Sequence, residues 1–181
     1  MKKVILVHGV GGSGQNHWFP WLKKKLEKQG FLVDAQDYPE TDTPNLEKWT
    51  GKLLPKIEKD CVLIGHSLGV STILKALEKY KGEKVLAVFS IAGFARHLEL
   101  DFSPLIDNFT EKGFDFEKIK QKIGSFFIWE SDDDPFVSGG EGDFLYQNLG
   151  GTKQIFPKRD HLAVWGNDEK FIELLDKIIQ L

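Results

Sequence analysis

Apolar residues in this chain gather in short, nearly continuous runs, and polar loops separate one run from the next. The runs at residues 4–7, 61–64 and 85–91 have the length of strands and little polar alternation, as expected for strands covered on both faces. Between them, apolar residues recur three or four positions apart, as they do along residues 70–77. The pattern therefore predicts strands that alternate with helices along the chain.

Six strands are expected, at about residues 4–7, 31–35, 61–64, 85–91, 125–129 and 152–156. Helices are expected at about residues 16–28, 44–55, 68–79, 116–122, 143–149 and 167–181. Thr43 is expected to cap the second helix, with Pro44 at its first position and a break at Pro55. This alternation predicts an α/β fold with an open, mostly parallel six-stranded sheet, helices on both faces, and a site at the carboxyl ends of the strands.

The composition is that of one globular domain spanning residues 1–181, because 41% of the residues are hydrophobic and no long linker divides the chain. The 24 basic and 27 acidic residues give a formal charge of −3, which argues against nucleic acid or an anionic membrane as the main partner. The first apolar run is too short for a signal peptide, and no run approaches the ~20 residues of a membrane span. Because Cys61 is the single cysteine, we expect a cytoplasmic protein.

Residues 65–69 read Gly-His-Ser-Leu-Gly, a complete G-x-S-x-G between a predicted strand and a predicted helix. In such a turn the serine hydroxyl stands above the edge of the sheet on a strained backbone, and a Cβ at either glycine would collide with neighbouring backbone. The start of the helix also favours negative charge beside the serine. Ser67 is therefore the candidate nucleophile.

Hydrolases with this turn carry an acid and then a histidine base further along the chain. Three adjacent aspartates follow the fifth predicted strand, and we favour Asp134 because Pro135 restricts its backbone to extended conformations. His161 follows the sixth strand and is the one histidine downstream of both Ser67 and Asp134. We expect His161 to act as the base, with Asp134 orienting its ring.

The remaining histidines and aspartates are expected to have supporting roles. His66 should pack beneath the turn, His8 and His17 should be structural or line the site, and His97 should lie on the surface. Asp132 and Asp133 are expected to be solvated neighbours that help to hold the loop. This acidic run lacks the alternating ligands and the central glycine of a calcium loop, so no metal or other cofactor is expected.

The glycine-rich loop at residues 9–14 has two interpretations. It satisfies G-x-G-x-x-G after a strand, and Asp34 or Asp37 would then bind the ribose of a dinucleotide in an oxidoreductase. Alternatively it is an oxyanion loop, in which the N–H of Val10 joins that of Leu68. We prefer the oxyanion role, because one fold then uses every motif and 181 residues leave little room for a second domain.

Several stretches resemble the small serine hydrolases of the YdeN / retinoblastoma-binding protein 9 group, within the α/β-hydrolase superfamily. They are His8-Gly9, Asn-His-Trp-Phe-Pro-Trp-Leu at residues 16–22, the Gly-His-Ser-Leu-Gly turn, Ser-Ile-Ala-Gly-Phe-Ala at residues 90–95, Ser-Asp-Asp-Asp at residues 131–134, and His161. The similarity covers nearly the whole chain and is closest to the bacterial YdeN-like members. It implies a compact hydrolase without a large lid, a triad of Ser67, Asp134 and His161, and cleavage of carboxylic esters or amides.

Two stretches depart from the pattern of that group. Ser138 stands where a proline is usual, with residues 139–142 following it, and Arg159-Asp160 precedes His161 where a glycine is usual. A Leu-x-Cys-x-Glu motif for binding a pocket protein is absent, so no such partner is expected.

The substrate is expected to be a small molecule. His8, Gly9, Trp18, Phe19, Phe94 and Trp165 are the candidate residues of its pocket. A binding module on a hydrolase scaffold, without catalytic activity, is the alternative from another class of protein. The sequence leaves the physiological substrate and the oligomeric state open.

Overall fold

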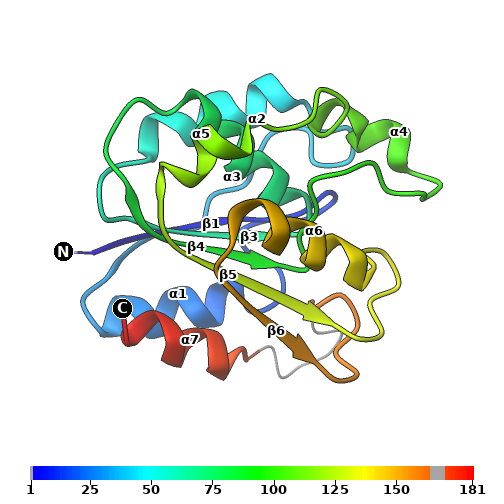
Figure 1. Ribbon diagram of the computed structural model, residues 1–181. Coiled ribbons are helices and arrows are strands. Elements are labelled where there is room, and N and C mark those ends of the chain that lie inside the picture. The colour runs from blue at the N-terminus through cyan, green and yellow to red at the C-terminus, as the bar shows by residue number, and fades with distance from the viewer. Residues whose placement is uncertain (1, 164–169) are drawn as a thin grey trace.

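A six-stranded parallel sheet forms the centre of the computed structural model, which describes residues 2–163 and 170–181 (Figure 1). The strands are β1 (Lys3–Val7), β2 (Leu32–Asp34), β3 (Val62–His66), β4 (Val85–Ile91), β5 (Ile123–Ser131) and β6 (Thr152–Phe156). They lie in the order β2-β1-β3-β4-β5-β6, and every neighbouring pair is parallel. The turn after β3 therefore opens near the middle of the sheet.

Helices cover both faces of the sheet. They are α1 (Phe19–Lys28), α2 (Leu46–Leu53), α3 (Leu68–Lys79), α4 (Ser103–Ile106), α5 (Phe116–Lys120), α6 (Gly139–Leu149) and α7 (Ile172–Ile179), with 3₁₀ turns η1 (Leu54–Lys56) and η2 (Asp107–Phe109). Figure 1 shows α1 and α7 together below the sheet, and α2, α3, α5 and α6 above it. The predicted fold class is confirmed.

The continuous apolar runs reflect this double coverage. In β1, Val4 and Leu6 pack with α1 and α7, whereas Ile5 and Val7 pack into the cluster beneath α2 and α3. Each of these four residues is at most 1% exposed to solvent. A strand with apolar contacts on both faces needs no polar alternation, which is why the period of two is missing from the sequence. Within the described residues, no helix combines the length and apolarity needed to cross a membrane.

The start of α2 differs from the prediction. Asn45, not Thr43, caps this helix, and its side chain accepts the N–H of Lys48 at 3.0 Å. The N–H of Leu46 is bound at 2.9 Å by Oδ1 of Asn108, which lies 62 positions away in η2. This long-range contact favours a helix that begins at Leu46 over one that begins at Pro44.

Other boundaries shift as well. α1 begins at Phe19 rather than near residue 16, α6 begins at Gly139 rather than residue 143, and α7 begins at Ile172 rather than residue 167. Of the residues predicted for that last helix, 167–169 lie outside the described ranges. β4 and β6 have the predicted bounds, residues 85–91 and 152–156. The break at Pro55 is also confirmed, because α2 passes into the 3₁₀ turn η1 there.

Candidate active site

Ser67 lies in a sharp turn between β3 and α3. Its backbone has φ 54° and ψ −122°, a conformation that is strained for a residue with a side chain. The two glycines of the motif make this turn possible. A Cβ on Gly65 would come within 2.7 Å of the amide nitrogen of Val70, and a Cβ on Gly69 within 2.1 Å of the carbonyl oxygen of Val7. The motif thus fits its surroundings only with glycine at both positions.

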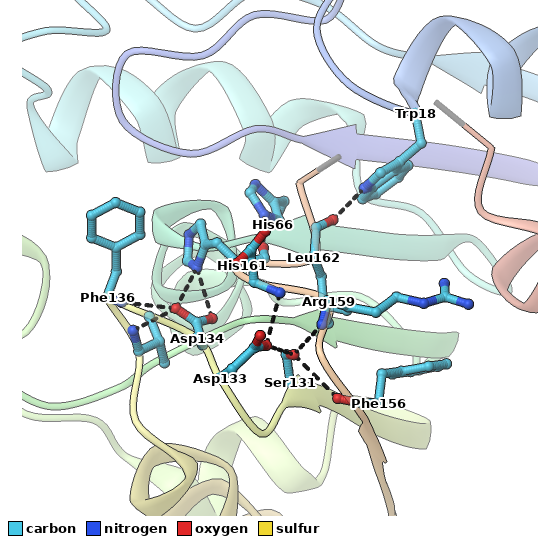
Figure 2. Close-up of polar contacts among 12 residues, drawn as sticks. Trp18, His66, Ser131, Asp133, Asp134, Phe136, Phe156, Arg159, His161 and Leu162 are labelled. Carbon is cyan, nitrogen blue, oxygen red and sulfur yellow. Dashed lines mark hydrogen bonds and ion pairs between the residues drawn. The ribbon is translucent and has the colours of Figure 1, made fainter. Parts of the chain in front are cut away.

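Asp134 and His161 are joined by a close polar contact. Nδ1 of His161 lies 2.8 Å from Oδ2 and 3.0 Å from Oδ1 of Asp134, whose side chain is 1% exposed (Figure 2). Oδ1 also accepts the backbone N–H groups of Phe136 and Val137, each at 2.9 Å. These donors fix the carboxylate, so the proton of the imidazole is held on Nδ1 and Nε2 is left as the basic nitrogen.

The loop that carries His161 is held by the residues just before Asp134. Three consecutive backbone N–H groups donate to three consecutive side chains: Lys158 to Asp132 at 2.8 Å, Arg159 to Ser131 at 2.9 Å and Asp160 to Asp133 at 2.9 Å. Figure 2 shows the contact between Arg159 and Ser131. The hydroxyl of Ser131 in turn donates to Asp133 at 2.7 Å and lowers the pKa of that carboxyl. Asp132 and Asp133 are exposed, as predicted, and they hold the loop that carries His161.

Two buried side chains hold the same loop from the other side. Nε2 of His66 lies 2.9 Å from the carbonyl oxygen of His161, and Nε1 of Trp18 donates to that of Leu162 at 2.9 Å. Full burial, together with the neighbouring His161, lowers the pKa of His66 well below 6.5. His66 is therefore neutral and donates from Nε2. Its position beneath the turn agrees with the prediction.

The loop that carries His161 needs these contacts because its backbone is strained. Lys158, Asp160 and Leu162 have φ of 54°, 46° and 50°, in the left-handed region that residues with side chains rarely adopt. A backbone with alternating strained residues persists only where its surroundings determine it. The contacts to Ser131, Asp132, Asp133, His66 and Trp18 supply that determination.

The glycine-rich loop packs directly against the nucleophile turn. A Cβ on Gly9 would lie 3.0 Å from Cβ of Ser67 and 3.4 Å from its Oγ. His8 fixes the loop: Nε2 accepts the N–H of Tyr38 at 2.8 Å, and Nδ1 donates to the carbonyl of Gly9 at 2.8 Å. Burial lowers the pKa of His8, in keeping with this neutral form. The loop is thus placed beside Ser67 at close range.

The acids expected in a dinucleotide site are already engaged. Oδ1 of Asp37 accepts the N–H of Gly14 at 2.7 Å, and Asp34 pairs with Lys56 at 2.8 Å. A Cβ on Gly14 would lie 1.9 Å from the carbonyl oxygen of Ala35, so a glycine is needed where this loop packs against the segment that follows β2. These contacts favour the oxyanion interpretation of residues 9–14.

Ser67 and His161 line one cavity of about 420 Å³. Six further predicted site residues line it: His8, Gly9, Val10, Phe19, Leu68 and Phe94. The expectation for Trp18 is wrong, because its ring is fully buried in the core beside Phe19 and Phe171 and does not reach the cavity. Trp165 lies outside the described residues. In the described ranges, no group of three or more His, Cys, Asp or Glu side chains could hold a metal ion.

Sequence analysis missed one wall of the cavity. It consists of Leu98, Leu100, Phe102, Ile106 and Phe136. The first three alternate with Glu99 and Asp101, and that alternation was the available signal. The segment was expected to be irregular, and it holds only the single turns α4 and η2. Its lining role depends on how it folds back over the end of the sheet.

Comparisons with known proteins point to one family. A model of the serine hydrolase family matches residues 4–174. The YdeN protein of Bacillus subtilis (strain 168) is 35% identical over 140 residues, which are 75% of this chain and 73% of that protein. Serine hydrolase RBBP9 of Rattus norvegicus is 25% identical over 164 residues, 88% of this chain and 86% of that one. The crystal structure of the ydeN gene product from B. subtilis matches with a TM-score of 0.93 and 28% identity, over 99% of this chain and 98% of that chain. The chain therefore belongs to the serine hydrolase family.

Proposed function

We propose that this serine hydrolase cleaves carboxylic esters, and amides of similar shape, through an acyl-enzyme intermediate on Ser67. The single observation that carries the proposal is the convergence of three features on one cavity: the strained serine turn, the His161–Asp134 contact, and the glycine loop. Each supplies a part that acyl transfer needs, namely a nucleophile, an oriented base, and backbone donors for an oxyanion.

In the first half of the reaction, Oγ of Ser67 attacks the substrate carbonyl carbon while Nε2 of His161 takes the hydroxyl proton. The negative charge that develops on the carbonyl oxygen is stabilised by the N–H groups of Val10 and Leu68. Leu68 is the first residue of α3, where an N–H has no acceptor within its own helix. Asp134 stabilises the imidazolium that forms, and it remains ionised.

Collapse of the tetrahedral intermediate passes the proton from Nε2 to the leaving oxygen or nitrogen, and the acyl-enzyme ester remains. Water then attacks this ester, gives its proton to Nε2, and releases the acid when Ser67 recovers the proton. Within the described residues, Oγ of Ser67 makes no hydrogen bond. Contacts of this kind often tighten only when substrate binds.

Labelling of the serine tests the proposal. A fluorophosphonate should modify wild type at Ser67, because only an activated serine hydroxyl is phosphonylated. Ser67→Ala should abolish labelling and reduce esterase activity by about 10⁶-fold, and His161→Ala should lose nearly as much. The double variant should lose scarcely more than either single variant, because the members act as a unit. Ser125→Ala, on an exposed position of β5, is the matched control and should retain both properties.

Two results would contradict the proposal: full activity in Ser67→Ala, or independent and multiplicative losses in the pair. A melting experiment tests the dinucleotide interpretation. NAD and NADP should leave the melting temperature unchanged, whereas a ligand at ~100 times its Kd would stabilise the fold by about 2.7 kcal/mol. A clear shift with either cofactor would favour the dinucleotide interpretation of residues 9–14.

We also infer that the enzyme works in the cytoplasm on a small molecule. Its single cysteine, Cys61, is 1% exposed, and burial raises the pKa of the thiol to about 11. Such a thiol is unreactive and forms no disulfide within the chain. Retention of full activity in Cys61→Ala under reducing and oxidising conditions is the expected result.

A further inference from the structure

The cavity has one apolar wall, formed by Leu98, Leu100, Phe102, Ile106 and Phe136. We call this group of residues the apolar wall. Its members follow β4 and β5, which lie on the same side of β3 in the sheet. The glycine loop follows β1, on the opposite side of β3. Ser67, at the end of β3, is thus placed between the backbone donors of one loop and the apolar side chains of the other.

The apolar wall is formed in advance rather than by closure of a flap. The buried hydroxyl of Ser103 accepts the N–H of Leu100 at 3.0 Å and donates to the carbonyl of Leu98. Where the segment leaves the sheet, the hydroxyl of Ser71 donates to the carbonyl of Phe94 at 2.6 Å. A subsite with its backbone fixed in this way has a definite size, so it discriminates between substrates by length.

Aromatic contacts connect the apolar wall to the proposed base. The ring centroid of Phe136 lies 6.1 Å from that of Phe102 and 5.2 Å from that of His161, edge to face in both cases. Figure 2 shows Phe136 beside His161 and Asp134. The apolar surface therefore reaches the place where the acyl carbon would be bonded to Ser67.

Among the described residues that line this cavity, none is Asp, Glu, Lys or Arg. Outside the turn and the proposed base, the polar side chains that line the cavity lie on the glycine-loop side: Ser13, Asn16 and His17 are half-buried or exposed, and His8 is buried. A charged group placed against the apolar wall would lose its hydration without gaining a partner of opposite charge, which is costly.

We propose that the apolar wall is the acyl subsite, and that the enzyme prefers uncharged aliphatic acyl groups of medium length over both the acetyl group and long chains. This inference rests on the proposed function. The cavity of about 420 Å³ lies toward the lower end of the ~300–1,000 Å³ that is typical of small-molecule sites, so it suits an acyl chain of limited length.

The acyl group, rather than the alcohol, belongs on the apolar wall because of the order of events. The alcohol leaves first and needs a path to solvent, which the open glycine-loop side provides. The acyl group stays bonded to Ser67 until water attacks, so it must be held throughout both halves of the reaction. Leu98 and Ile106, at 8% and 3% exposure, form the buried part of the apolar wall, whereas Leu100 and Phe102 are half-buried and Phe136 is 38% exposed.

A series of 4-nitrophenyl esters tests the preference. For wild type, kcat/KM should rise by about fourfold per methylene from the acetate through the first few members, and level off near the octanoate. An acyl group of matched length that ends in trimethylammonium should be at least about 100-fold poorer than its neutral counterpart. A flat dependence on length, or equal use of the charged ester, would overturn the inference.

Two neighbouring leucines provide the matched variants. Leu100→Trp fills the apolar wall and should lower kcat/KM for the octanoate at least about tenfold more than it lowers kcat/KM for the acetate. Leu105 lies on α4 but is 42% exposed and does not line the cavity, so Leu105→Trp should leave both values within about twofold. Equal effects of the two substitutions would count against the inference. Should Leu100→Trp lower the melting temperature, Leu100→Ala decides, and it should move the optimum to longer chains.

Failure of this inference is distinguishable from failure of the proposed function. Acetate hydrolysis that depends on Ser67 but shows no chain-length preference would overturn the acyl subsite alone. If the wild type is neither labelled by the fluorophosphonate nor able to hydrolyse the acetate, the proposed function is overturned, and the acyl subsite with it.

Discussion

His66 donates from Nε2 to the backbone carbonyl of His161 across 2.9 Å, although 95 positions separate the two residues in sequence. The residue that precedes the proposed nucleophile therefore holds the main chain of the proposed base. Because this donor is fully buried and neutral, the contact ties the geometry of the site to pH.

Stability should fall in acid because of His66 and His8. Burial lowers the folded-state pKa of both groups, so below pH ~6.5 the unfolded chain binds protons that the folded chain does not. The unfolding free energy then decreases as pH falls, by up to about 1.4 kcal/mol per pH unit for each histidine. Above pH ~6.5 both states are neutral at these positions, and the contribution is constant.

Urea denaturation between pH 5 and 7.5 measures this slope. His66→Gln keeps a side-chain donor but removes the titration, so its slope should be shallower by about 1.4 kcal/mol per pH unit. His97→Gln removes an exposed imidazole and serves as the control. An unchanged slope in His66→Gln would show that the buried imidazole titrates alike in the folded and unfolded chains.

The three adjacent aspartates should differ sharply in kinetics. Asp134→Asn should lower kcat on the order of 10⁴-fold, because an amide favours the wrong tautomer of His161. Asp132→Asn and Asp133→Asn should act weakly, because an amide oxygen can still accept the N–H groups of Lys158 and Asp160. Steady-state assays on a short-chain ester compare the three. A crippled Asp133→Asn beside an active Asp134→Asn would assign the orienting role to Asp133.

The contact between Asp134 and His161 could be predicted from sequence because each residue follows a strand, and parallel strands bring their carboxyl ends to one edge. The hold of His66 and Trp18 on the His161 loop could not be inferred. It depends on backbone carbonyls, which no sequence pattern marks. The predicted start of α2 was wrong for a related reason: Thr43 and Asn45 are both good caps, and the contact from Asn108 in η2 selects Asn45. The apolar wall was not predicted, because its segment has no helical period.

Two glycines in helices should respond in opposite ways to alanine. Gly69→Ala should destabilise by about 3 kcal/mol or more, because its Cβ would meet the carbonyl oxygen of Val7 at 2.1 Å. Gly51→Ala, within α2 and with nothing within 4 Å of the new Cβ, should stabilise by about 0.5–1 kcal/mol. Chemical denaturation of both variants gives the comparison. A harmless Gly69→Ala would mean that the turn can move away from β1.

Asp160→Gly should stabilise the protein by about 0.5–1 kcal/mol. Its φ of 46° suits glycine, and its N–H would still donate to Asp133. Asp101→Gly, at an exposed loop position with ordinary φ, should instead be neutral or slightly destabilising. Melting temperatures of the pair, with esterase activity alongside, check both expectations. A lower melting temperature for Asp160→Gly would show that its carboxylate stabilises more than the strain costs.

In the part of the chain that the structure describes, β6 pairs with β5 alone, so it is the edge of the sheet on that side. The loop with His161 begins where β6 ends. Edge elements can open locally at a free energy below that of global unfolding. Such an opening would carry His161 away from Asp134 while β1, β3 and β4 stay paired. Activity should therefore disappear at a lower urea concentration than the far-ultraviolet circular dichroism signal. The proposed base thus follows an edge strand of the sheet, and the nucleophile follows a central one.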